Sequence, residues 1–166
     1  IKKLLPVYKL LENLEKSPQL DNKDLIGFVG APWTLLVYMI NKVSPKNGLQ
    51  ETFFKDEALI KNIFSVLDRF IKLHIKNQVE AGATIIQIFD SWAGLILKDF
   101  EKYLYEPTKS LVDYTKGLGV PVICFPRSIQ DYKTYCDTIN PDAINIDYNV
   151  NPESISNKLK LPIQGG

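Results

Sequence analysis

Two aspartates stand at the ends of predicted strands, where a carboxylate can take up or release a proton. Asp90 follows the apolar run at residues 84–89, and Asp147 ends the run at residues 143–147. Both would project toward one edge of a sheet and act as general acids or bases. The alternative for each is a structural carboxylate that caps a helix or orders a loop. The sequence leaves both interpretations open.

Other polar residues near strand ends favour ligand binding over nucleophilic catalysis. Ser91 would need a neighbouring base, and the single histidine, His74, lies on the apolar stripe of a predicted helix. We therefore expect His74 to pack between helix and barrel, and Ser91 to donate a hydrogen bond to a ligand. Arg127 suits a bidentate contact with a carboxylate, with a solvated loop arginine as the alternative.

Aromatic residues gather near two successive strand ends and predict one wall of an apolar pocket, with plain packing as the alternative. They are Phe28, Trp33, Tyr38 and Trp92. The cysteines Cys124 and Cys136 lack the spacing of zinc ligands. We expect them to be buried free thiols in a reducing compartment, and we expect no metal site.

Composition excludes several classes of protein. The 166 residues, 45% apolar and 23% charged, suit one domain with a real core and do not suit a disordered or collagen-like chain. Lys and Arg total 20 against 19 Asp and Glu, so neither nucleic acid nor an anionic membrane is an expected partner. No run approaches the ~20 apolar residues of a membrane span. With no signal-peptide pattern, a cytoplasmic protein is expected.

These residues need elements that carry them to one edge, and apolar periodicity predicts an alternation of strands and helices. Short β-branched or apolar runs predict five strands, at residues 25–29, 84–89, 120–125, 143–147 and 161–164. Spacings of three and four predict helices at residues 1–16, 33–41, 57–80, 97–105, 107–116, 128–139 and 152–160, with a break at Pro107.

This alternation predicts an α/β fold with a parallel sheet and right-handed crossovers. A doubly wound open sheet and a (β/α)8 barrel both fit, and both bind ligands at the carboxyl ends of their strands. A barrel needs eight units and about 250 residues, so five units would be about five-eighths of one. The chain starts at Ile1 without Met and stops at Gly166 as a strand ends, which favours the barrel. We therefore expect residues 1–166 to form a single domain, a partial (β/α)8 TIM barrel of about five consecutive βα units.

Two longer segments resemble one enzyme family. Residues 25–35, LIGFVGAPWTL, with Tyr38 and Met39 after them, are similar to a hallmark stretch of uroporphyrinogen decarboxylase. Residues 81–83, AGA, and 87–94, QIFDSWAG, resemble a second stretch of that family, in the same order. The later strand segments look like its subsequent barrel strands. The chain therefore resembles the central fragment of that enzyme, without its N-terminal and C-terminal parts.

The resemblance implies a carboxy-lyase of porphyrin and haem biosynthesis, a (β/α)8 barrel that is a homodimer when full length. Such an enzyme converts uroporphyrinogen III to coproporphyrinogen III by decarboxylating four acetate side chains, with no metal or organic cofactor. Protonation of a pyrrole carbon creates a cation that accepts the electrons left by CO2. Electrostatic stabilisation of that cation would be the main contribution of the protein.

The resemblance also implies three substrate-binding residues for the tetrapyrrole. Tyr38 matches a tyrosine that contacts the substrate, Ser91 matches a Ser/Thr position that hydrogen-bonds it, and Phe28 matches an aromatic wall of the cleft. The arginine-rich segment and aspartate of the family align upstream of Ile1, and its histidine aligns downstream of Gly166. We therefore expect no catalytic residue here and an inactive isolated chain.

Two alternatives remain open from the sequence. Cobalamin-linked methyltransferases of the same superfamily hold zinc with a His-x-Cys pair on the strand that here contains Cys124, but Val122 stands where that histidine would be. The second alternative is a non-catalytic tetrapyrrole-binding protein, which the matches at Tyr38 and Ser91 make the weaker choice.

Overall fold

Five strands form one parallel sheet in the computed structural model, which describes residues 2–165. Ile1 and Gly166, which belong to the first predicted helix and the last predicted strand end, lie outside the described residues. The strands are β1 (Ile26–Gly30), β2 (Ile85–Asp90), β3 (Val122–Pro126), β4 (Ala143–Asn145) and β5 (Ile163–Gln164). The α-helices are α1 (Leu5–Glu15), α2 (Pro32–Ile40), α3 (Glu57–Glu80), α4 (Glu106–Gly117), α5 (Tyr132–Ile139) and α6 (Pro152–Ser156).

Every strand pairs in parallel with the strand that follows it in the chain, in the order β1-β2-β3-β4-β5. A doubly wound sheet would reverse its winding at a switch point, and these strands show no reversal. The sheet is therefore an arc of a (β/α)8 barrel, which confirms the predicted partial barrel.

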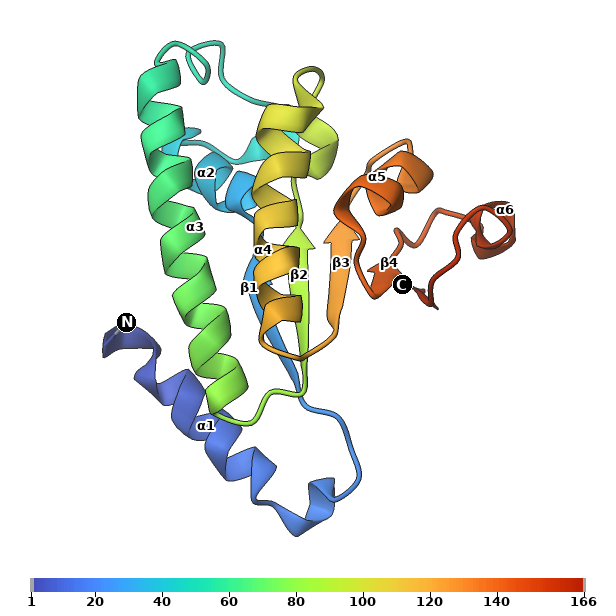
Figure 1. The fold of residues 1–166 in the computed structure, drawn as a ribbon. Coiled ribbons are helices and arrows are strands. Elements are labelled where there is room, and N and C mark those ends of the chain that lie inside the picture. Colours follow the sequence, from blue (N-terminus) through green and yellow to red (C-terminus); the bar gives the residue numbers. More distant parts are fainter. Residues whose placement is uncertain (1, 166) are drawn as a thin grey trace.

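Helices cover one face of this arc and leave its concave face open. Figure 1 shows α3 and α4 side by side across β1, β2 and β3. On β1, Gly27 and Val29 are buried beneath the helices, whereas Ile26 and Phe28 on the concave face are 43% and 62% exposed. The alternation follows from the two-residue period of a strand. The concave face is therefore lined in part by exposed apolar side chains.

Helix α3 has the bounds that the apolar periodicity predicts. Asp56 caps its first turn by accepting the N–H of Leu59 at 2.8 Å, and Gly82 follows its last residue with a φ of +105°. Its apolar stripe includes Ile60, Ile71 and Ile75, all buried against the sheet and α4. Within residues 2–165, no helix is both long enough and apolar enough to span a membrane.

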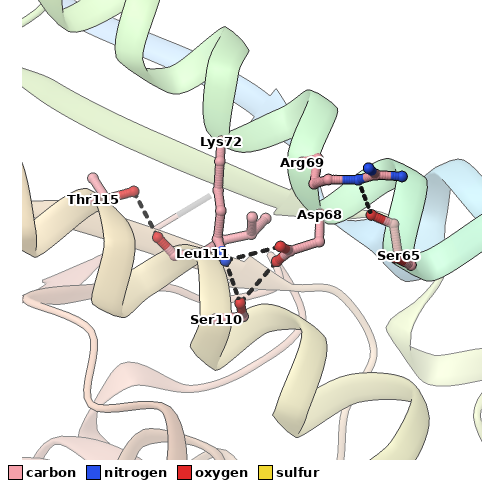
Figure 2. Close-up of polar contacts among 7 residues, drawn as sticks. All are labelled: Ser65, Asp68, Arg69, Lys72, Ser110, Leu111 and Thr115. Carbon is pink, nitrogen blue, oxygen red and sulfur yellow. Dashed lines mark hydrogen bonds and ion pairs between the residues drawn. The ribbon is translucent and has the colours of Figure 1, made fainter.

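Polar side chains join α3 to α4 outside the barrel, and Figure 2 shows this contact. The Ser110 hydroxyl donates to Asp68 Oδ1 at 2.7 Å and accepts from Lys72 Nζ at 2.7 Å. Lys72 also pairs with Asp68 at 2.9 Å. Ser110 therefore bridges an ion pair on α3 and fixes the register between the two helices.

The predicted break at Pro107 is wrong. A π-helical turn, Glu101–Tyr105, runs directly into α4, and Pro107 lies in the first turn of that helix. Proline has no N–H to donate to a carbonyl of the preceding turn, and the wider π-helical turn lies directly before it. The chain therefore changes its helical pitch here without being interrupted.

The last helices are shorter than predicted. Helix α5 begins at Tyr132 instead of at residue 128, because Ser128 adopts a left-handed φ of +62° and Asp131 caps the helix by accepting the N–H of Thr134. Helix α6 ends at Ser156 instead of at residue 160, and β4 ends at Asn145. The extra loop residues after β3 and β4 become available to shape the edge of the sheet.

Replacing Ser110 with Ala removes the bridge between α3 and α4 while leaving Asp68 and Lys72 paired. We expect the free energy of unfolding to fall by about 1 kcal/mol, the usual net value of a hydrogen bond whose groups can bond to water instead. Urea unfolding measures it. Ser65→Ala on α3 is the control, because it gives the same gain in helix propensity without removing a bridge. Equal stability of the two variants would contradict this role of Ser110.

Candidate active site

The turn after β2 is tied to the start of α2 by side chains from both segments. The Trp33 indole N–H donates to the carbonyl of Trp92 at 2.8 Å. The backbone N–H of Trp92 donates to the Thr34 hydroxyl at 3.1 Å. These contacts fix the residues that follow β1 against those that follow β2, at the carboxyl edge of the sheet.

The three predicted substrate-binding residues all lie near this edge. Tyr38 is 59% exposed on α2, and its ring meets the Trp92 ring edge to face at 6.1 Å between centroids. Ser91 precedes Trp92 in the turn after β2. Phe28 lies on the concave face of β1, where its ring contacts Phe89 of β2 at 6.1 Å. The geometry therefore offers an exposed aromatic surface beside a serine hydroxyl.

The Gln78 side chain of α3 holds the backbone of Phe28. Its Oε1 accepts the N–H of Phe28 at 3.0 Å, and its Nε2 donates to the carbonyl of Phe28 at 3.1 Å. The amide satisfies the N–H and the carbonyl of Phe28, which point away from β2. A Cβ on Gly27 would lie 2.9 Å from the same Oε1, so this approach needs a glycine. The position of Phe28 is therefore set by a helix 50 residues further along the chain.

Asp90 does not project toward the mouth of the barrel, and the structure favours the second interpretation, a carboxylate that orders a loop. It shares the helix-facing side of β2 with the buried Ile86 and Ile88, and it is only 1% exposed. Its Oδ1 accepts the hydroxyl of Thr34 at 2.7 Å, and its Oδ2 has no partner among the described residues. Burial raises the pKa of Asp90 to about 7. Asp90 acts through Thr34 to hold the turn that carries Ser91.

Asp147 orders the loop after β3, as the structural alternative predicts. Its Oδ2 accepts the N–H of Ser128 at 2.6 Å and the hydroxyl of Tyr132 at 3.0 Å. Its Oδ1 lies 3.9 Å from Arg127 Nε, and the Arg127 side chain is still 52% exposed. Asp147 is therefore engaged within the protein, while about half of the Arg127 side chain stays exposed.

A cavity of about 370 Å³ opens at this edge, between the turns after β2 and β3 and the loop after α2. Its polar or charged lining residues are Lys46, Ser91, Arg127 and Ser128, and the others are Trp92, Gly94 and Leu95. Gly94 donates its N–H to the carbonyl of Arg127 at 3.0 Å. A Cβ on Gly94 would lie 2.6 Å from Ser128 Cβ, so only glycine allows the two turns to approach this closely.

His74 and the two cysteines lie outside this edge. His74 packs against α1 instead of the barrel, with Nδ1 2.9 Å from the Tyr8 hydroxyl, and burial lowers its pKa. Cys124 and Cys136 are buried free thiols, as predicted. Burial raises the pKa of each to about 12, so both are poor nucleophiles at neutral pH.

Sequence reasoning missed Thr34, Gln78 and Lys46. A hydroxyl in the first turn of the helix after β1 is a usable signal for Thr34, because that turn lies at the edge where ligands bind. Neither Gln78, among apolar helix residues, nor Lys46, in a polar loop, carries a comparable signal. Their contacts depend on residues far along the chain.

Comparison with known proteins identifies the family. The family model for uroporphyrinogen decarboxylase (URO-D) matches residues 1–166. The chain belongs to the uroporphyrinogen decarboxylase family. A uroporphyrinogen decarboxylase of Wolbachia sp. subsp. Brugia malayi (strain TRS) is 37% identical over 168 residues, covering 98% of this chain and 48% of that protein. A uroporphyrinogen decarboxylase from Campylobacter jejuni (strain RM1221) is 34% identical over 171 residues, covering 99% of this chain and 50% of that protein. The chain thus spans about half the length of these relatives.

The solved structures add support for the fold alone. A methyltransferase from Methanosarcina mazei matches with a TM-score of 0.69 at 15% identity, covering 98% of this chain and 48% of that one. In the present chain, Val122 and Cys124 both lie on the helix-facing side of β3 and are fully buried. Among residues 2–165 there is no group of three or more His, Cys, Asp or Glu that could hold a metal ion. Val122 has no metal-ligating side chain, so the His-x-Cys pair of the methyltransferase alternative is not present on β3.

Asp90→Asn tests the buried carboxyl group. The folded protein favours the protonated acid, with a pKa of about 7 against 3.8 for the free group. Its contribution to stability is therefore present below about pH 4 and is lost as pH rises toward about pH 7. Asn does not ionise, so we expect the stability of the variant relative to wild type to rise by a few kcal/mol across that range. Urea unfolding at several pH values measures it, and a constant difference would contradict the assignment.

Proposed function

We propose that this chain is part of a uroporphyrinogen decarboxylase, which converts uroporphyrinogen III to coproporphyrinogen III by removing CO2 from four acetate side chains. The observation that carries the proposal is the arrangement of Phe28, Tyr38 and Ser91 at one edge of the barrel arc, in a chain of this family. Residues 1–166 then form the central part of a single barrel domain. The complete enzyme is cytoplasmic and a homodimer.

The aromatic surface suits a macrocycle built of electron-rich pyrrole rings. Phe28 and Phe89 meet edge to face at 6.1 Å, and Phe89 meets Phe125 of β3 in the same way at 6.1 Å. These three rings form a continuous apolar strip across β1, β2 and β3 on the concave face. Pyrrole rings that lie on this strip are shielded from water, which strengthens every electrostatic contact to the cation formed by protonation.

The polar groups at the edge suit the side chains of the same substrate. The Tyr38 hydroxyl, on an exposed side chain, and the Ser91 hydroxyl, at the cavity, each provide a donor for a carboxylate or a pyrrole substituent. The Trp92 ring lies between them and keeps Tyr38 beside the turn that carries Ser91. Proton transfer itself is assigned to residues outside this chain, since the arginine, aspartate and histidine positions of the family have no counterpart in it.

Steady-state decarboxylation by the complete product of the coding sequence that contains residues 1–166 tests the assignment. We expect Tyr38→Phe to lower kcat/KM about 10-fold to 100-fold, because a hydrogen bond to a charged group is lost. We expect Ser91→Ala to lower it several-fold to about tenfold. Tyr114→Phe on α4 and Ser65→Ala on α3 are the matched controls and should match wild type. Wild-type rates in both Tyr38→Phe and Ser91→Ala would refute these roles. A wild-type protein unable to form coproporphyrinogen would refute the function.

The isolated 166-residue chain should release no coproporphyrinogen from uroporphyrinogen, because the arginine, aspartate and histidine positions of the family lie outside it. Chromatography of the reaction products measures this. Turnover by the isolated chain would show instead that groups within residues 1–166 perform the proton chemistry.

A further inference from the structure

The cavity between the turns after β2 and β3 is lined by two cationic residues that are not among the three proposed substrate-binding residues. Lys46 and Arg127 share it with Ser91 and Ser128, and no described residue that lines it is acidic. A lining of two cations and two hydroxyls attracts an anion and can hydrogen-bond its oxygens. At about 370 Å³ the cavity suits a side-chain carboxylate and is small for a whole tetrapyrrole.

The turns that form this cavity are held in place by contacts within the protein. The N–H of Arg127 donates to the carbonyl of Asp90 at 3.0 Å, and the N–H of Gly94 donates to the carbonyl of Arg127 at 3.0 Å. Ser128 reaches Asp147 through its backbone N–H, so its hydroxyl is not committed to that contact. The turns after β2, β3 and β4 are thereby joined, and the side chain of Arg127 begins from a rigid support.

The side chain of Asn41 orders the loop that carries Lys46. Asn41 is buried at the end of α2, and its side chain donates to the carbonyl of Val43 at 3.1 Å. Its Oδ1 accepts the N–H of Gln50 at 2.9 Å. This amide closes the loop over residues 41–50 and keeps Lys46 beside the turn that carries Ser91. Lys46 and Arg127 therefore reach one cavity from separate loops. Asn41 orders the first loop, and Asp147 orders the second.

The geometry points to a carboxylate subsite in which Lys46 and Arg127, with the Ser91 and Ser128 hydroxyls, bind one acidic side chain of the substrate. This inference rests on the proposed function and extends it to residues outside the resemblance. The bound carboxylate is one that is retained in that round of the reaction. A cation paired with the departing carboxylate would stabilise the charged ground state over neutral CO2 and slow its loss. The subsite therefore acts in binding and orientation.

Kinetics of Arg127→Gln and Lys46→Gln in the complete protein test this role. Each substitution removes a charged hydrogen bond made equally in the ground state and the transition state. KM for uroporphyrinogen should therefore rise about 10-fold to 100-fold while kcat stays within about twofold of wild type. Arg127→Lys, which keeps the charge, should recover most of the loss. Arg69→Gln on the outer side of α3, shown in Figure 2, makes the same charge change away from the cavity and should leave KM unaltered.

The outcomes separate the subsite from the proposed function. An unchanged KM in both Arg127→Gln and Lys46→Gln, in an enzyme that Ser91→Ala impairs, overturns the subsite and leaves the function standing. A wild-type protein that converts no uroporphyrinogen overturns the function, and direct binding then decides the subsite.

Tryptophan fluorescence supplies that direct measurement, since Trp92 lines the cavity and the chain has only two tryptophans. Titration with propane-1,2,3-tricarboxylate should change the emission of wild type and of Arg69→Gln, but not of Arg127→Gln. Equal responses in wild type and Arg127→Gln overturn the subsite. An Arg127-dependent response to inorganic phosphate without one to the tricarboxylate overturns its assignment to carboxylates.

Discussion

Each strand of this sheet hydrogen-bonds to the strand that follows it in the chain, so every βα unit winds in the same direction. The helices consequently lie on one face, and the opposite face is left to the side chains of alternate strand residues. All carboxyl ends also meet at a single edge. The aromatic strip on the concave face and the cavity at the edge both follow from this one pattern of pairing. Phe28 and Ser91, although 63 positions apart, belong to neighbouring strand ends for this reason.

Buried polar contacts link the segments that meet at this edge. Thr34 accepts from the backbone of Trp92 and donates to Asp90, so one hydroxyl links α2, the end of β2 and the turn beyond it. Burying an acid is unfavourable, and the raised pKa of Asp90 shows that the folded protein lessens this cost by favouring the neutral form. These hydrogen bonds restrict the geometry of the turn that carries Ser91.

The substrate proposed for this family member combines four pyrrole rings with many carboxylates. The aromatic strip suits the rings, and the cavity between the turns after β2 and β3 suits a carboxylate. Phe28, Phe89 and Phe125 offer an apolar face to the rings, whereas Lys46 and Arg127 offer charge to a side chain. The cations lie in an arc whose overall charge is nearly balanced, with 20 basic and 19 acidic residues. The proposed carboxylate subsite therefore depends on the placement of charge and not on its total.

The sequence by itself determined the local elements and the family. Apolar spacing sustained over seven turns, with Asp56 before it and Gly82 after it, determined α3 because each signal is local to the helix. Periodicity did not show which side of β2 faces the helices, because its run is almost wholly apolar, and Asp90 was placed on the wrong side for that reason. Only the tertiary structure decided the strand order, since a barrel and a doubly wound sheet share the same alternation of elements. It also decided the contacts of Thr34 and Gln78 with distant backbone, and the place of Lys46 at the cavity, because local sequence does not encode which distant segments meet.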